Sequence, residues 1–90
     1  MAIVAVITKI MPSSPTSNLK KIEEESKKIL EKQGAMNISF EQKPIAFGLK
    51  AIFIKMAWPE EKSTELIESS LAKIKNISSV NIEDYRRAFG

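Results

Sequence analysis

The side chains that most often perform chemistry in proteins are poorly represented in this sequence. The chain of 90 residues contains no histidine and no cysteine. The commonest general base, the commonest metal ligand and the thiolate nucleophile are therefore all absent. Carboxylates do cluster at Glu23, Glu24 and Glu25. Because consecutive residues of a helix point in different directions, we expect this cluster to be a solvated helix face rather than a catalytic group.

The sequence also lacks the patterns that are typical of metal-binding and nucleotide-binding sites. Asp84 is the only aspartate, which leaves no aspartate pair for Mg²⁺. The phosphate-binding pattern Gly-x-x-x-x-Gly-Lys is also absent. The sequence therefore predicts no catalytic residue, no metal site, no cofactor and no direct binding of a nucleotide by this chain.

Two short segments have the composition of a protein-binding surface. In the first, Phe47 stands beside Gly48 and is followed closely by Lys50. The second is the end of the chain, where Arg86 and Arg87 precede Ala88-Phe89-Gly90. Aromatic residues and arginines are enriched at binding hot spots. The alternatives are that Phe47 packs in the core and that the arginines belong to a solvated terminus.

Length and composition limit the number of domains, the kinds of partner and the location that we expect for this protein. Ninety residues suffice for one core and one domain, which we assign to residues 1–90. The net charge of +3 is too small to argue for a nucleic-acid partner by itself. The longest apolar run, residues 1–7, is too short to span a membrane and lacks the flank of a secretory signal. We therefore expect a cytoplasmic protein with no membrane partner.

Hydrophobic periodicity predicts two helices and four strands. Strands are predicted at residues 2–11, 36–43, 45–58 and 79–87, and helical stripes at residues 19–33 and 66–74. Ser17 or Asn18 is the expected N-cap of the first helix, and Gly34 is expected to follow its last turn. Within the third strand, Gly48 suggests a bulge or a close approach of the backbone.

The order of these elements is strand-helix-strand-strand-helix-strand. The first and third strands are apolar on both sides and belong in the middle of a sheet, whereas the second and fourth alternate and belong at its edges. Right-handed crossovers then give an antiparallel sheet of order 4-1-3-2 with both helices on one face. This is the ferredoxin-like fold of the α+β class.

A further expectation concerns the direction of the strands. If the first and third strands run parallel and the fourth opposes both, the start of the third strand lies beside the end of the fourth. Phe47 and Gly48 would then lie about 10 Å from Arg86 and Arg87, at ~4.8 Å per strand step. One partner could contact both segments at a single compact site.

RNA-recognition domains share this topology and carry exposed aromatic residues on their first and third strands. The segment 45–52 matches that pattern only at Phe47 and Gly48, and the first strand, residues 2–11, has no aromatic residue. The sequence therefore argues against a base-stacking platform and against direct binding of nucleic acid.

Three segments carry a resemblance to a known family. They are Lys9-Ile10-Met11-Pro12 with the Ser/Pro loop that follows, Pro44-Ile45-Ala46-Phe47-Gly48-Leu49-Lys50, and Glu83-Asp84-Tyr85-Arg86-Arg87. Along its whole length the chain resembles the archaeal elongation factor 1-beta family, which has the guanine nucleotide exchange domain of elongation factor 1. The resemblance implies a ferredoxin-like fold and exchange of GDP for GTP on elongation factor 1-alpha, the GTPase that delivers aminoacyl-tRNA. It implies an exchange factor that acts through protein–protein binding and is not an enzyme.

The resemblance also implies which residues contact the GTPase. In the eukaryotic relatives an aromatic residue before the glycine makes this contact, and it matches Phe47. Those relatives use a lysine next to the C-terminus, where this chain has Ala88-Phe89-Gly90 and its nearest cations are Arg86 and Arg87. The expected partner-binding residues are Phe47, Gly48, Lys50, Arg86 and Arg87. Two other functions remain open, a small-molecule regulatory domain and an RNA-binding domain.

Overall fold

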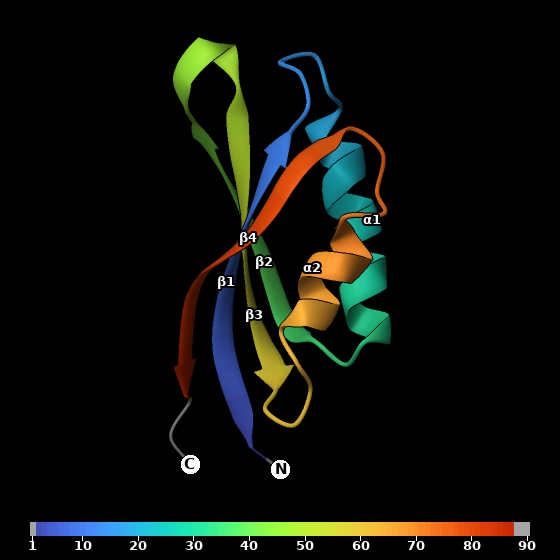
Figure 1. Ribbon diagram of the computed structural model, residues 1–90, viewed down its shortest axis with the longest axis vertical. Coiled ribbons are helices and arrows are strands. Elements are labelled where there is room, and N and C mark those ends of the chain that lie inside the picture. Colours follow the sequence, from blue (N-terminus) through green and yellow to red (C-terminus); the bar gives the residue numbers. More distant parts are fainter. Residues whose placement is uncertain (1, 88–90) are drawn as a thin grey trace.

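The computed structural model describes residues 2–87 and, within them, six elements in the predicted order. They are β1 (Ile3–Pro12), α1 (Leu19–Lys32), β2 (Met36–Pro44), β3 (Lys50–Pro59), α2 (Glu65–Leu71) and β4 (Ile77–Arg87), with a short 3-10 turn at Ala46–Gly48. The strands form one sheet in the order β2-β3-β1-β4, and both helices lie on one face of it (Figure 1). The predicted ferredoxin-like α+β fold is confirmed.

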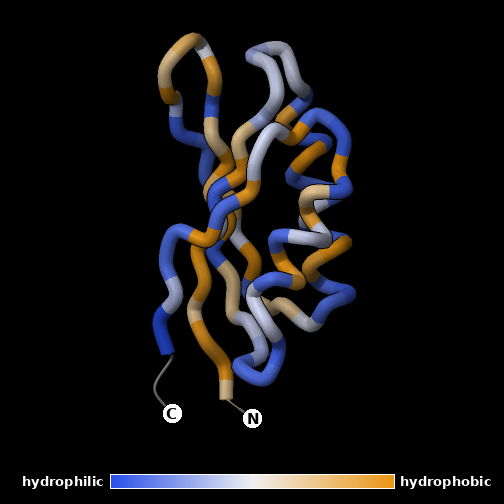
Figure 2. The backbone as a smooth tube through the Cα atoms, viewed as in Figure 1, coloured by the Kyte–Doolittle hydropathy of each residue, from blue (hydrophilic) through white to orange (hydrophobic). Residues whose placement is uncertain are grey.

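The core lies between this sheet and the two helices. Apolar stretches run along β1 and β3, the two central strands, while the end of β4 is hydrophilic (Figure 2). Alternate residues of each central strand face the helices and are buried. The largest fully buried apolar side chains are Trp58, Ile10, Leu30, Ile52, Ile54, Ile67, Leu71, Val4 and Val6. Burial of these side chains provides the main driving force for folding.

Local sequence signals define the ends of the helices. The Asn18 side chain caps α1 by accepting a hydrogen bond from the Lys21 backbone N–H at 3.1 Å. Gly34 follows the last turn with a φ of 101°, a conformation that glycine adopts without steric cost. At α2 the Ser63 hydroxyl accepts from the Glu65 backbone N–H at 3.1 Å. This helix ends at Leu71, before the last residue of the predicted apolar stripe.

The strand directions differ from our expectation. β1 is antiparallel to both of its neighbours, β3 and β4, so β3 and β4 run parallel to each other. The physical reason lies in the connections. A strand-helix-strand crossover returns the chain to the end where it started, whereas the tight connection between β2 and β3 reverses it. The expectation that the first and third strands run parallel is therefore wrong.

Candidate functional site at two ends of the sheet

The tip of the β2–β3 hairpin presents Phe47 to solvent. The Phe47 residue is 92% exposed, so it does not pack in the core. The predicted third strand begins only at Lys50, because residues 45–49 form a turn. This turn is closed by hydrogen bonds from the Ile45 N–H to the Leu49 carbonyl at 2.8 Å and from the Leu49 N–H to the Ala46 carbonyl at 3.3 Å. The hairpin therefore holds a large apolar side chain away from the rest of the molecule.

The backbone of this tip has an uncommon conformation. Phe47 has a φ of 61° and Gly48 a φ of 73°, so two successive residues lie in the left-handed region. For a bulky residue such as Phe47 this conformation is strained, by about 1–3 kcal/mol, and such strain gathers at functional sites. A methyl group on Gly48 would meet Pro15 Cβ at 4.0 Å, which places the Ser/Pro loop beside the tip. Gly48 thus serves a tight turn rather than the predicted strand bulge.

Arg86 and Arg87 extend from the end of β4 on opposite faces of the sheet. Arg86 pairs in register with Ala5 and its Nε lies 3.0 Å from Asp84 Oδ2. Arg87 pairs with Val4 and its Nη2 lies 3.4 Å from Glu60 Oε1. Both arginine side chains are more than three-quarters exposed. Their ion pairs are therefore screened by water and can be exchanged for those of a partner.

The structure does not bring the two segments together. Arg87 faces Val4 near the start of β1, whereas the start of β3 faces the other end of β1, where Ile52 pairs with Ile10. The six residue steps between Val4 and Ile10 alone span roughly 20 Å. In Figure 1 the hairpin tip and the end of β4 lie at opposite ends of the long axis, which measures 41 Å. The predicted spacing of about 10 Å is wrong, because β3 and β4 are parallel.

The remaining residues of interest lie beside the hairpin turn and at the end of β4. Lys50 is exposed at the first position of β3, beside the hairpin turn. Tyr85 is exposed and shares a face of β4 with Arg87. Ala88, Phe89 and Gly90, which follow Arg87 in the sequence, lie outside the described residues.

Metal binding and membrane spanning find no support within residues 2–87. No group of three or more carboxylates in this part of the chain could hold a metal ion. Neither helix of the described chain is long and apolar enough to cross a membrane.

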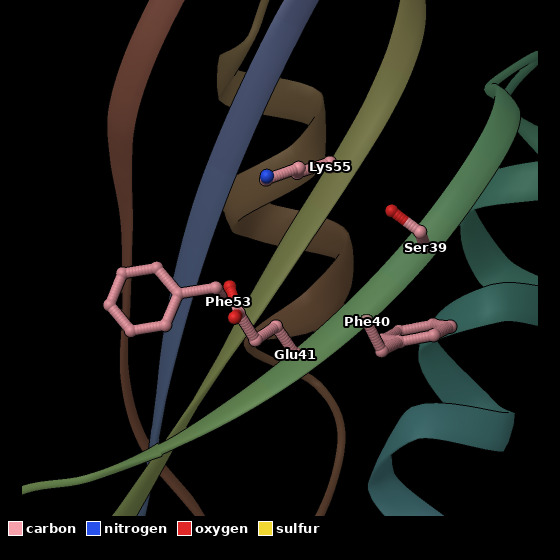
Figure 3. A pocket seen from close by; sticks show the side chains of 5 residues that line it. All are labelled: Ser39, Phe40, Glu41, Phe53 and Lys55. Carbon is pink, nitrogen blue, oxygen red and sulfur yellow. The ribbon is translucent and has the colours of Figure 1, made fainter.

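A hollow on the uncovered face of the sheet contains a residue that the sequence analysis missed. Ser39, Phe40, Glu41, Phe53 and Lys55 line it, and Figure 3 shows the Phe40 side chain turned away from the others, toward α1. Phe53 is half-buried on the side opposite the helices, with the Lys43 ammonium 4.8 Å from its ring centroid. Alternation along β3 could have found it, because Phe53 lies between the buried Ile52 and Ile54.

Comparison with known proteins identifies the family of this chain. Residues 5–88 match the family described as the EF-1 guanine nucleotide exchange domain. The chain belongs to this family. The match includes all five residues expected to contact a partner, so both ends of the sheet lie within the exchange domain.

Several curated relatives of the exchange-domain family cover nearly the whole chain. Elongation factor 1-beta of Methanocaldococcus jannaschii is 43% identical over 81 residues, which are 89% of this chain and 91% of the relative. Elongation factor 1-beta of Methanocella arvoryzae is 37% identical over 99% of this chain and 100% of its own. The protein of the same name from Ignicoccus hospitalis is 35% identical over 97% and 94%, respectively. The resemblance to the archaeal family is thereby confirmed, and with it a guanine nucleotide exchange role in translation elongation.

Proposed function

We propose that this protein promotes the exchange of GDP for GTP on elongation factor 1-alpha. Exchange would regenerate the GTP form of the GTPase, which binds aminoacyl-tRNA, in the cytoplasm where translation takes place. The protein would act by binding the GTPase and not by covalent chemistry. Membership of the exchange-domain family supports this proposal, as do the curated elongation factor 1-beta relatives.

The exposed Phe47 is the observation that best supports a docking role. A phenylalanine on a solvent-exposed turn leaves its apolar surface in water, and the left-handed backbone adds strain. Neither feature stabilises the isolated domain. Both are understandable if the side chain enters a pocket of the GTPase, with Gly48 shaping the turn and Lys50 adding a charge beside it. Aromatic anchors of this kind commonly dominate binding energy.

The arginines are proposed to act at the other end of the sheet. The nucleotide and Mg²⁺ region of a GTPase is rich in charge, and a guanidinium introduced there would compete electrostatically with the cation. Arg87 is the better placed of the two because it lies nearer the end of the chain and shares a face with Tyr85. The separation of the ends requires the GTPase surface to extend for more than roughly 20 Å if it contacts both.

Thermodynamic linkage describes how such binding would release GDP. A factor that weakens GDP binding to the GTPase is itself bound more weakly when GDP is present, by the same factor. Each 1.4 kcal/mol of coupling corresponds to a tenfold change in affinity. No nucleotide needs to contact the exchange factor itself.

The direct test is the release of fluorescent GDP from the cognate elongation factor 1-alpha, with and without this protein. We expect the protein to accelerate release in proportion to its concentration until the GTPase is saturated. In parallel, calorimetry of the isolated protein with GDP should show no binding at micromolar concentrations. An unchanged release rate would contradict the exchange function, and micromolar GDP binding would contradict its proposed mechanism.

A further inference from the structure

The face of the sheet opposite the helices is not covered by any described element of the chain. Strand register aligns four of its side chains in one row across the sheet. Lys9 of β1 pairs with Phe53 of β3 and with Asn81 of β4, and Phe53 also pairs with Glu41 of β2. A partly buried aromatic ring therefore lies in this row between the Glu41 carboxylate and the Lys9 ammonium, with the Asn81 amide beyond Lys9.

Two lysines lie beside the Phe53 ring, and a third lies on the same face of the sheet. The ammonium of Lys43 lies 4.8 Å from the ring centroid and that of Lys9 lies 6.0 Å from it. Lys55, two residues further along β3, projects on the same side of the sheet as Phe53 (Figure 3). Cations at this distance from the face of a ring are attracted to its negative quadrupole. The ring and the ammonium groups of Lys9 and Lys43 therefore form one cluster, and Lys55 adds a third cation on the same face.

The cluster has an excess of positive charge. Two carboxylates share this face, and each already lies near a cation, with Glu41 3.8 Å from Lys43 and Asp84 3.0 Å from Arg86. Within residues 2–87, Lys9 and Lys55 have no carboxylate within 4.0 Å. The ammonium groups of Lys9 and Lys55 on this face are thus available for an anionic partner.

We propose that this face binds a short segment of single-stranded RNA. One base stacks on Phe53, and Lys9, Lys43 and Lys55 contact the phosphates on either side. Stacking on an aromatic residue within a cationic groove is the usual way in which proteins bind single strands. The amide of Asn81 and the hydroxyl of Ser39 lie on the same face and can bond with a base edge or a ribose 2′-hydroxyl.

The composition of the face favours RNA over a protein partner. Lysines are depleted in the buried centre of protein–protein interfaces, where their hydrated ammonium groups would have to lose water. Here Lys9 and Lys43 lie beside the aromatic residue in the row. Phe53 stands one position beyond the segment 45–52, which lacks the aromatic pattern of RNA-recognition domains except at Phe47 and Gly48.

The test uses fluorescence anisotropy of a labelled octauridine RNA with the full chain, from about 50 to about 200 mM salt. Affinity should fall with salt, by a slope of about −0.7 per phosphate contacted. Phe53→Leu should weaken binding at least fivefold without changing the slope. Lys9→Gln and Lys55→Gln should each make the slope shallower. The matched control is Lys27→Gln, which removes the same charge from an exposed position of α1, on the opposite side of the sheet.

Several outcomes would overturn the proposal. One is the absence of saturable binding at about 50 mM salt, and another is equal weakening by Lys9→Gln and Lys27→Gln, which would indicate non-specific attraction. Equal affinity for octathymidine DNA would contradict the preference for RNA. Melting curves establish that Phe53→Leu is folded. If this variant lost GDP exchange while its RNA affinity stayed at the wild-type value, the face would belong to the GTPase instead.

Discussion

The hairpin tip and the end of β4 are both exposed, yet they are built in opposite ways. At the tip, Phe47 is an apolar side chain held by a closed turn and lies almost wholly in solvent. At the end of β4, Arg86 and Arg87 already have carboxylate partners, Asp84 and Glu60. If both regions contact the GTPase as proposed, the first can do so without rearrangement, whereas the second must replace its present ion pairs with new ones.

Because of this difference, we expect the hairpin tip and the end of β4 to contribute to the free energy of binding in different ways. Docking of a preformed apolar anchor removes surface from water, so its contribution depends little on salt. When exposed ion pairs within the protein are replaced by ion pairs with a partner, the net gain in binding free energy is small, and salt screens it. Variants at each end should therefore differ in both the size and the salt dependence of their effects.

The largest effect is expected for Phe47→Ala. Truncation of a hot-spot aromatic residue costs about 2 kcal/mol or more of binding, so the factor concentration that gives half-maximal GDP release should rise roughly 30-fold. Thermal stability should change little, since Phe47 is 92% exposed. The matched control is Leu66→Ala, an exposed leucine of α2. A collapse in melting temperature for Phe47→Ala, or unchanged exchange, would contradict the docking role.

Arg87→Ala should slow GDP release by a smaller factor, and the double variant Arg86→Ala/Arg87→Ala should be slower than either single variant. The loss should diminish as ionic strength rises, because exposed charges are screened over about 8–10 Å at physiological salt. The loss for Phe47→Ala should persist under the same conditions. Lys27→Ala controls for the change in net charge. Wild-type release by the double variant would show that exchange needs no cation at the end of β4.

Gly48→Ala should have a moderate effect on exchange. An L-residue at its φ of 73° is strained by about 1–2 kcal/mol, so the turn that holds Phe47 should distort. Gly34→Ala is a matched control, because Gly34 also has a positive φ, 101°, but follows α1. Both variants should melt at lower temperature, and only Gly48→Ala should impair GDP release. Equal impairment by both would attribute the effect to global stability.

Thr8→Val should leave exchange unchanged while raising stability. The Thr8 hydroxyl is buried in the middle of β1 and has no hydrogen-bond partner within the described chain. Replacing it with a methyl group removes an unsatisfied polar group and should add about 1 kcal/mol to the free energy of unfolding. Thr8→Ser keeps the hydroxyl and loses a methyl, which should cost about 0.5–1.5 kcal/mol. Denaturant titration measures both changes, and a less stable Thr8→Val variant would refute the prediction.

The sequence alone was sufficient to predict the order of the helices and strands, the order of the strands in the sheet and the family. Asn18 and Gly34 predicted the ends of α1 because caps and left-handed residues act over a few neighbouring positions. The distinction between two-sided and alternating strands predicted the central positions of β1 and β3, since burial on one or both faces follows from local composition. The motif around Phe47 and Gly48 carried the family resemblance, which the match over residues 5–88 confirmed.

The tertiary structure decided how the candidate residues are arranged. Apolar residues 45–49 resemble a strand, and only the closed turn shows that Phe47 lies in solvent and not in the core. The separation of Phe47 from Arg87 depends on strand direction, which the hairpin and the two helical crossovers set together. The cluster of Lys9, Lys43 and Phe53 depends on register between three strands. Composition and periodicity are local properties of the chain, whereas these distances arise between residues that only folding brings together.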